Sequence, residues 1–452
     1  MKSKIIFILS LCLCVSAVNS PAQKSKEKPN ADIQKMLREV SAKNIETTIS
    51  KLASFGTRNT LSEQDNPARG IGAARDYLFG EFQKISVDCG GCLQVEKQTF
   101  LQPKAARVPE PTNLTNVVAT LKGITNPERV YVVSGHYDSM CSSPTDAKCD
   151  APGANDDASG TAAVVELARV MSTRRFDATI IFMTVPGEEQ GLLGAAYFAE
   201  QAKKNGMNIE AMFTNDIIGG VTSYKNAPDR QSVRVFAEGV PSNESEQEAA
   251  QRRSVGGEND SASRQLGRFI KEVADVYSPK FSVQLMYRRD RYLRGGDHIP
   301  FLERGFSAVR FTEPHEDYTH QHQSVKIVDG KQYGDLPEFV DFEYVANVTR
   351  VNAASLAALA LAPARPKNVG INTARLTNDT DLKWDANTDA DLAGYEVVWR
   401  NTTSPFWTNS VFVGNATTYT AKEMSKDNYF FGVRAVDKAG NKSPVSFPKP
   451  AR

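Results

Sequence analysis

Apolar runs of strand length alternate with helical segments between residues 116 and 313 of the chain. The apolar runs are rich in Val and Ile, which is typical of strands buried on both faces of a parallel sheet. Strands are predicted at 116–123, 129–139, 177–189, 209–219 and 307–313, and helices at 160–173, 192–206 and 263–277. Strands that alternate with helices form βαβ units. The pattern therefore predicts an α/β fold with a mostly parallel central sheet and helices on both faces.

Further helices are expected on either side of this alternation. Helical periodicity runs through 33–54 and 68–85, and an Ala-rich helix is predicted within 335–362. A polar stretch at 221–262 is expected to be an insertion between a strand and a helix. The prolines of a short linker at 363–366 end the Ala-rich helix, since proline cannot continue it.

A second domain is predicted after the linker, over residues 367–452. Short runs of alternating apolar and polar residues at this spacing are typical of an all-β sandwich. Trp384, Tyr395 and the stretch 429–444, YFFGVRAVDKAGNKSP, resemble a fibronectin type III domain. Such a domain is expected either to contact a polymer or a cell surface or to serve only as a spacer.

The amino terminus has the pattern of a secretory signal peptide over residues 1–20. Lys2 and Lys4 precede an apolar run at 5–18, which is shorter than the ~20 residues that span a bilayer. An uncleaved anchor is the alternative interpretation. Cleavage would leave a flexible, polar lead-in at 21–34 and a secreted or periplasmic protein that has no membrane span.

The net charge of the chain is close to zero and excludes little about its function. The chain has 54 Lys and Arg residues against 53 Asp and Glu residues, a net charge of +1. Loss of Lys2 and Lys4 with the signal peptide would turn this excess into a deficit of one. Because proteins that bind nucleic acids carry a clear basic excess, no nucleic-acid partner is expected.

Four cysteines remain after the signal peptide, and an even number in an exported chain favours disulfides. Pairing between sequence neighbours would give Cys89–Cys92 and Cys141–Cys149. A redox or zinc-binding pair is the alternative for Cys89 and Cys92, although a redox pair usually lies between a strand and a helix, unlike this turn-like DCGGC segment.

Acidic residues gather where the predicted strands end. In a parallel sheet the carboxyl ends of the strands meet at one edge, where ligands bind. Carboxylates crowded at such an edge repel one another unless cations neutralise them, and imidazole and carboxylate ligands suit zinc. The histidine and the acids in question are His136, Asp138, Asp156, Asp157, Glu188, Glu189 and Asp216.

The segments that hold these residues, GHYDS, APGANDDASG, VPGEEQGLLGA and TND, resemble the metal-binding motifs of the M28 family of zinc peptidases. The resemblance covers residues 35–362. It implies a three-layer α/β/α sandwich that holds two zinc ions. It further implies that the protein hydrolyses peptides.

The resemblance also implies a role for each residue. His136 and Asp216 would bind one zinc ion, Asp156 would bridge the two ions, and Glu189 would bind the second. Asp138 would hold the imidazole of His136, and Glu188 would be the general base.

The last metal ligand must be a histidine. His320 fits the family pattern best, and His322 is its nearest rival. His315 and His298 are less favoured. His298 belongs to a GDHIPF segment that, in the family, shapes the site without binding metal.

The activity expected from this resemblance is that of an aminopeptidase acting on peptides with a free amino terminus. Carboxypeptidases and glutaminyl cyclases share the fold, and receptor ectodomains of the family have lost the activity. Glutaminyl cyclases lack the first-metal histidine, which is present here as His136.

The sequence offers fewer candidates for substrate binding than for metal binding. Arg294, Asp297 and Tyr318 lie near the expected site in sequence. A carboxypeptidase would need a cation for the substrate carboxylate, and the arginines of YRRDRYLRGG (287–296) offer one. The alternative is that these arginines only form salt bridges on a solvated loop.

Overall fold

A computed structural model of the protein describes residues 29–222 and 228–451. The predicted signal peptide lies outside the described residues, as does the predicted lead-in up to residue 28. The end of that lead-in, predicted to reach residue 34, overlaps the first helix, α1 (Ala31–Arg38). This helix begins at Asn30, whose side chain accepts hydrogen bonds from the backbone of Asp32 and Ile33, an ordinary amino-terminal cap.

An eight-stranded sheet forms the centre of the larger domain, in the order β1-β2-β4-β3-β5-β8-β6-β7. Strands β4, β3, β5 and β8 run parallel to one another, and β6 runs parallel to β7. The hairpin of β1 and β2, the β2–β4 pair and the β6–β8 pair are antiparallel. The sheet is therefore parallel at its centre and mixed at its edges. The strands are β1 (Leu93–Gln102), β2 (Thr112–Leu121), β3 (Asn126–His136), β4 (Ala178–Val185), β5 (Asn208–Asn215), β6 (Ser232–Phe236), β7 (Ser282–Met286) and β8 (Ala308–Thr312).

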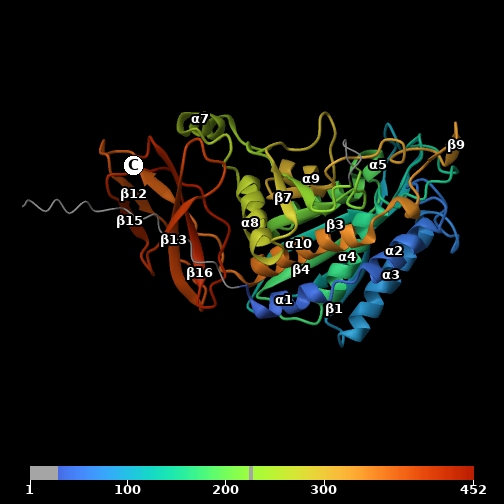
Figure 1. The fold of residues 1–452 in the computed structure, drawn as a ribbon, viewed down its shortest axis with the longest axis horizontal. Helices are drawn as coiled ribbons and strands as arrows, with labels where there is room; N and C mark the ends of the chain where they lie inside the picture. Colours follow the sequence, from blue (N-terminus) through green and yellow to red (C-terminus); the bar gives the residue numbers. More distant parts are fainter. Residues whose placement is uncertain (1–28, 223–227, 452) are drawn as a thin grey trace, which may run out of the picture.

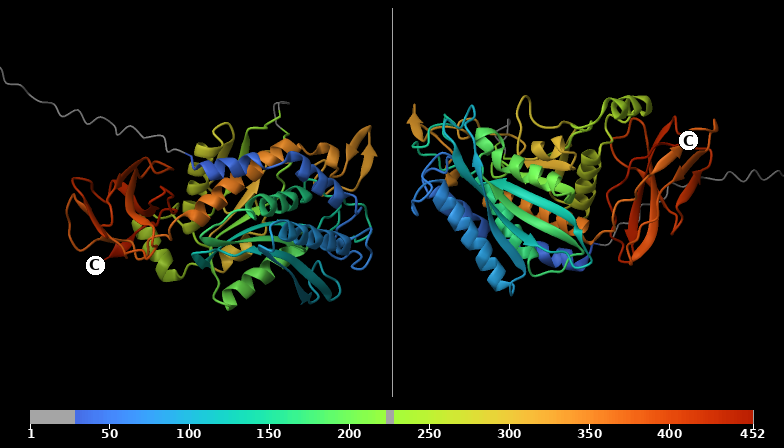
Figure 2. Two further views of the ribbon diagram at one scale, coloured as in Figure 1. Left: turned by 90° about the horizontal axis from the view of Figure 1, so that it is seen from below. Right: turned by 180° about the vertical axis from the view of Figure 1, so that it is seen from behind.

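Helices cover both faces of this sheet (Figure 2), which confirms the predicted α/β/α arrangement. One face packs in a large apolar core with α1, α2, α3, α4, α8 and α10, and the other packs in a smaller core with α6 and α9. These helices are α2 (Ala42–Ala53), α3 (Ile71–Asp88), α4 (Ala158–Met171), α6 (Leu193–Lys204), α8 (Ala262–Tyr277), α9 (Ile299–Glu303) and α10 (Phe342–Leu361). Every residue of β4 is buried, as its unbroken apolar sequence predicts.

The polar stretch at 221–262 is not a simple insertion. It contributes strand β6 to the sheet and then forms α7 (Glu246–Val255), a helix with no buried residue. The polar sequence of α7 hid its helical structure, since an exposed helix needs no apolar face. A capping box of Ser245 and Glu248 marks its start.

The smaller domain is an all-β sandwich of two sheets, ordered β15-β12-β11-β17 and β14-β13-β16. Its core includes Trp384 and Tyr395, whose rings meet edge to face at 5.5 Å. The predicted sandwich is confirmed, and its assignment to the fibronectin type III class stays a prediction. The strands are β11 (Gly370–Asn372), β12 (Thr380–Lys383), β13 (Leu392–Asn401), β14 (Asn409–Phe412), β15 (Thr418–Ala421), β16 (Tyr429–Asp437) and β17 (Lys449–Ala451).

The sandwich lies against α8 (Figure 1). Asp260, just before α8, forms ion pairs with Arg268 at 2.8 Å and with Arg400 of β13 at 2.7 Å. Trp407 of the sandwich donates its indole N–H to Gln265 on α8, at 3.0 Å. Buried polar contacts therefore fix the sandwich to the larger domain.

Both predicted disulfides are present, Cys89–Cys92 and Cys141–Cys149. Among the helices of the described residues, none is long and apolar enough to cross a membrane.

Candidate metal centre

The carboxyl ends of three neighbouring parallel strands supply most of the site. His136 is the last residue of β3, and Asp216 follows β5 directly. Glu188 and Glu189 open α5 (Glu188–Gly191), a short helix just after β4. Since β4, β3 and β5 are adjacent in the sheet, these side chains meet at one edge, as the sequence predicts.

Two groups of candidate metal ligands lie at this edge. His136, Glu188 and Asp216 form one group, with their ligand atoms within 4.8 Å of one another. Asp156, Glu189 and His322 form the second group by the same criterion.

Asp156 joins the two groups. Its Oδ1 atom lies 3.2 Å from His136 Nε2, and its Oδ2 atom lies 2.9 Å from His322 Nε2. One carboxylate thus offers an oxygen to each group, which is the arrangement of a bridging ligand.

His322 takes the place in the site that was expected of His320. The ring of His320 stacks on Phe339 at 3.8 Å, and its Nδ1 lies 3.7 Å from Asp317. A turn at 317–321 directs His320 away, whereas His322, in the left-handed region at φ 53°, reaches within 3.0 Å of Glu189. The placement expected of His320 is therefore wrong.

The remaining histidines stand apart from both groups. The Nε2 atom of His298 lies 2.9 Å from the Arg289 carbonyl oxygen. Within the described ranges, neither His298 nor His315 belongs to a group of candidate metal ligands.

The donor set fits zinc. Among the described residues, His136 Nε2 and Glu189 Oε1 are buried and form no hydrogen bond, although Asp156 and His322 lie 3.2 and 3.0 Å from them. Buried polar atoms without partners are costly, and a metal ion would satisfy both. Imidazole and carboxylate are ligands that zinc accepts.

The excess of carboxyl groups in the site favours the binding of a cation. Although burial lowers the pKa of His322, the carboxylates of Glu189 and Asp156 raise it to about 11. Burial raises the pKa of Glu188 well above its usual value, and the carboxyl groups of Asp216 and Glu189 raise it further. The cluster therefore holds more negative charge than its own side chains compensate, as expected of a cation site.

Asp138 contacts residues of both groups, beyond the single contact with His136 that the sequence predicts. Its Oδ1 atom lies 3.4 Å from His136 Nδ1. Its Oδ2 atom accepts hydrogen bonds from the Glu189 backbone at 3.2 Å and from the Thr60 hydroxyl at 3.1 Å. A carboxylate behind a histidine ligand fixes the ring and its tautomer.

Asp157 has a structural role. It caps α4 by accepting a hydrogen bond from the Gly160 backbone at 3.0 Å. Its other oxygen accepts from the His136 backbone at 2.9 Å. Asp157 therefore connects the start of α4 to the end of β3.

Three supporting residues were missed from the sequence. Arg310, fully buried on β8, pairs with Asp216 at 2.6 Å. Asp335 accepts hydrogen bonds from the backbone of Asn155 and Asp156, and the Gln321 amide donates to Asp156. Of these three residues, only Arg310 could have been found from the sequence, because it is a charged residue inside the apolar strand SAVRFTE.

The three substrate-binding candidates differ in their surroundings. Asp297 is buried, its two oxygens have no hydrogen-bond partner in the described part of the chain, and burial raises its pKa to about 7. Arg294 is half-buried and pairs with Glu316 at 2.5 Å. Tyr318 is exposed on its loop.

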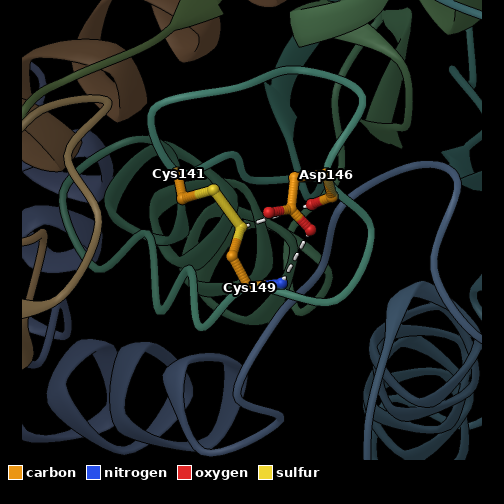
Figure 3. Close-up of side chains that lie close together, drawn as sticks. All are labelled: Cys141, Asp146 and Cys149. Carbon is orange, nitrogen blue, oxygen red and sulfur yellow. Dashed lines mark hydrogen bonds between the residues drawn. A yellow bond between two sulfur atoms is a disulfide. The ribbon is translucent and has the colours of Figure 1, made fainter.

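A third group, Cys141, Asp146 and Cys149, is not available for metal because its two sulfur atoms form a disulfide (Figure 3). Asp146 accepts a hydrogen bond from the Cys149 backbone at 3.1 Å. The loop reaches the site region, since the Ser142 hydroxyl lies 2.9 Å from that of Ser324. This group therefore stabilises a loop beside the site.

Known sequences that are similar to this chain belong to zinc peptidases. The family model described as Peptidase family M28 matches residues 116–334. A protein from Leptosphaeria maculans, named a probable zinc metalloprotease, is 50% identical over 422 residues, which are 93% of this chain and 98% of that protein. A protein of the same description from Pyricularia oryzae is 49% identical over 432 residues, or 94% of this chain and 86% of that protein.

Solved structures share the fold at low sequence identity. LapB from Legionella pneumophila superposes with a TM-score of 0.53 and 18% identity, covering 75% of this chain and 78% of LapB. An aminopeptidase from Aneurinibacillus sp. strain AM-1 gives a TM-score of 0.50 and 16% identity, covering 73% of this chain and 96% of that enzyme. These likenesses support the α/β architecture of the larger domain.

Proposed function

Since the chain belongs to peptidase family M28 and is a zinc metallopeptidase, we propose that it is a secreted aminopeptidase that uses two zinc ions. The observation that carries the two-ion proposal is the position of Asp156, which has one oxygen in each group of ligands.

The ligands divide between two sites. His136 and Asp216 would hold one ion, Glu189 and His322 would hold the other, and Asp156 would contact both. Each ion would then have three protein ligands, which leaves room for water or substrate, as catalytic zinc requires. Bound zinc would supply Lewis-acid activation of the attacking water and of the scissile carbonyl.

Glu188 is the residue placed to move protons. It lies in the first ligand group, and burial raises its pKa above the usual value of a carboxyl, which favours a group that accepts a proton and later donates it. It would take a proton from the attacking water and deliver it to the nitrogen of the departing amine. Its backbone N–H donates to Asp138 at 3.3 Å, which fixes its position.

A free amino terminus is the substrate feature that this site favours. The carboxyl groups exceed those needed for two ions, and Asp297 is buried with both oxygens lacking hydrogen-bond partners in the described ranges. A substrate ammonium group supplies the charge and the donors that such carboxylates need. Export is supported by the two disulfides, which persist in oxidising compartments.

A substrate panel tests the proposal. The protein is assayed with leucyl p-nitroanilide, its N-acetylated form, a peptide blocked at both ends and a peptide with amino-terminal glutamine. We expect cleavage of substrates with a free amino terminus and not of the blocked ones, and we expect this activity to be lost with a chelator and restored by zinc. Cleavage of the blocked peptide, release of carboxyl-terminal residues or cyclisation of the glutamine would each contradict it.

A further inference from the structure

A surface pocket of about 420 Å³ lies beside the metal centre. Its apolar lining is formed by Leu192 and Ile299, and residues 288–291, 294 and 295 provide the rest. We call it the arginine pocket, because four of its lining residues are Arg288, Arg289, Arg291 and Arg294.

Two residues that line the arginine pocket connect to the candidate metal ligands. Leu192 donates its backbone N–H to the Glu188 carbonyl at 3.0 Å. Elsewhere in the lining, the Gly295 carbonyl accepts a hydrogen bond from Arg310 Nη1 at 2.9 Å. The same nitrogen lies 2.6 Å from Asp216. A substrate at the centre therefore has this pocket as a neighbour.

Positive charge exceeds negative charge around the pocket. A single carboxylate, Glu316, pairs with Arg294 at 2.5 Å, with Arg291 at 3.2 Å and with Arg234 at 3.2 Å. Asp290, the one acid that lines the pocket, is buried and already lies 3.0 Å from Arg291.

Arg288 is the least compensated cation. It rests on the ring of Tyr292 at 4.4 Å, and within the described residues it forms no ion pair. Its neighbour Arg289 pairs with Glu303 at 2.8 Å, where both side chains are largely exposed to solvent. Arg288 and part of Arg294 thus remain available to an anion.

We propose that the arginine pocket binds a carboxylate of the peptide substrate, carried on a short aliphatic stem. The stem would lie on Leu192 and Ile299, and the carboxylate would meet the guanidinium groups of Arg288 and Arg294, which bind carboxylates through paired hydrogen bonds. The carboxylate is either the side chain of an amino-terminal acidic residue or the carboxyl terminus of a short peptide. The proposal rests on the proposed peptidase function.

Kinetics with matched substrates test the inference. The first comparison is the ratio of kcat/KM for α-glutamyl p-nitroanilide to kcat/KM for glutaminyl p-nitroanilide, two substrates that differ by one charge and have nearly the same shape. The second comparison is the ratio of kcat/KM for a dipeptide to kcat/KM for its amide, which lacks the charge of the carboxyl terminus. A ratio above about ten is expected in one of the two pairs. R288Q and R294Q should each lower that ratio about fivefold, since a half-exposed ion pair contributes less than a buried one.

The control R253Q removes an exposed arginine from α7, outside the pocket, and should leave the ratio at the wild-type value. Ratios near one in both pairs, or equal losses on the charged and neutral substrates in R288Q and R294Q, would overturn the inference.

A binding measurement separates this inference from the proposed aminopeptidase activity. Free glutamate and free glutamine are titrated into the zinc-loaded protein by calorimetry, which needs no turnover. Tighter binding of glutamate, reduced about fivefold in R288Q, supports an acidic side chain even if no nitroanilide is cleaved. Equal affinities, together with equal binding of a dipeptide and its amide, would refute the carboxylate site.

Discussion

The junction between the two domains depends on one buried carboxylate, and D260N tests this. The side chain of Asp260 is 1% exposed, that of Arg268 is 1% exposed and that of Arg400 is 3% exposed. Asparagine in place of Asp260 would leave two buried guanidinium groups with no counter-charge. Breaking a buried pair in this way costs about 3 kcal/mol of unfolding free energy or more.

Guanidinium-induced unfolding, followed by tryptophan emission, measures the loss of unfolding free energy in the sandwich. The chain has 3 tryptophans, and Trp384, Trp399 and Trp407 all belong to the sandwich. R400M should cost less than D260N, because Arg268 remains 2.8 Å from Asp260. The difference between the two variants therefore shows how much of the unfolding free energy depends on the ion pair of Arg400.

The matched control is D275N on α8. Asp275 makes an exposed pair with Lys271 at 3.0 Å, spaced four residues apart on the helix. Such pairs contribute about 0.3–0.5 kcal/mol. If D260N destabilised the protein no more than D275N, the reasoning from burial would be refuted.

Three predictions concern the metal centre. H322A should lower the zinc content measured by plasma mass spectrometry from the proposed two ions per chain toward one, whereas H320A should not. The reverse result would contradict the assignment of His322. E188Q should lower kcat at least about 100-fold with zinc content unchanged, and retained activity would exclude Glu188 as the base. D335N should weaken zinc binding about tenfold in a chelator competition, because Asp335 holds the backbone of Asp156; unchanged affinity would show that this contact is dispensable.

Most of the candidate site residues that the structure brings together share one property, which is a short distance along the chain from the end of an apolar strand. His136 ends β3, Asp216 follows β5, and Glu188 and Glu189 follow β4. Strand ends can be located from hydrophobicity alone, and adjacency in a parallel sheet then brings these side chains together. The hydrophobic pattern therefore predicts most of the fold and the meeting of these four side chains at one edge of the sheet.

The choice between His320 and His322 depended on contacts that the sequence does not reveal. Both lie on a loop within three positions of each other, so neither periodicity nor strand ends separate them. The stacking of His320 on Phe339 and the left-handed backbone at His322 decide which ring reaches Asp156. The same holds for Asp335, which reaches Asn155 from 180 residues further along the chain.

The antiparallel edges of the sheet escaped prediction for a related reason. An apolar run locates a strand but not the direction of its neighbour, and β6 entered the sheet from a polar stretch. Only the short hairpin connection between β1 and β2 carries directional information, because a parallel pair needs a longer crossover.

The position of the sandwich bears on the arginine pocket. Tyr287 is the last residue before the segment 288–295 that lines this pocket, and its hydroxyl donates to the Pro405 carbonyl of the sandwich at 2.7 Å. The guanidinium of Arg264 on α8 stacks on the same ring at 3.8 Å. The arginine segment is thus anchored at its base by a contact between the two domains. A sandwich that served only as a spacer would need no such contact, so its packing contributes to the shape of the peptidase domain.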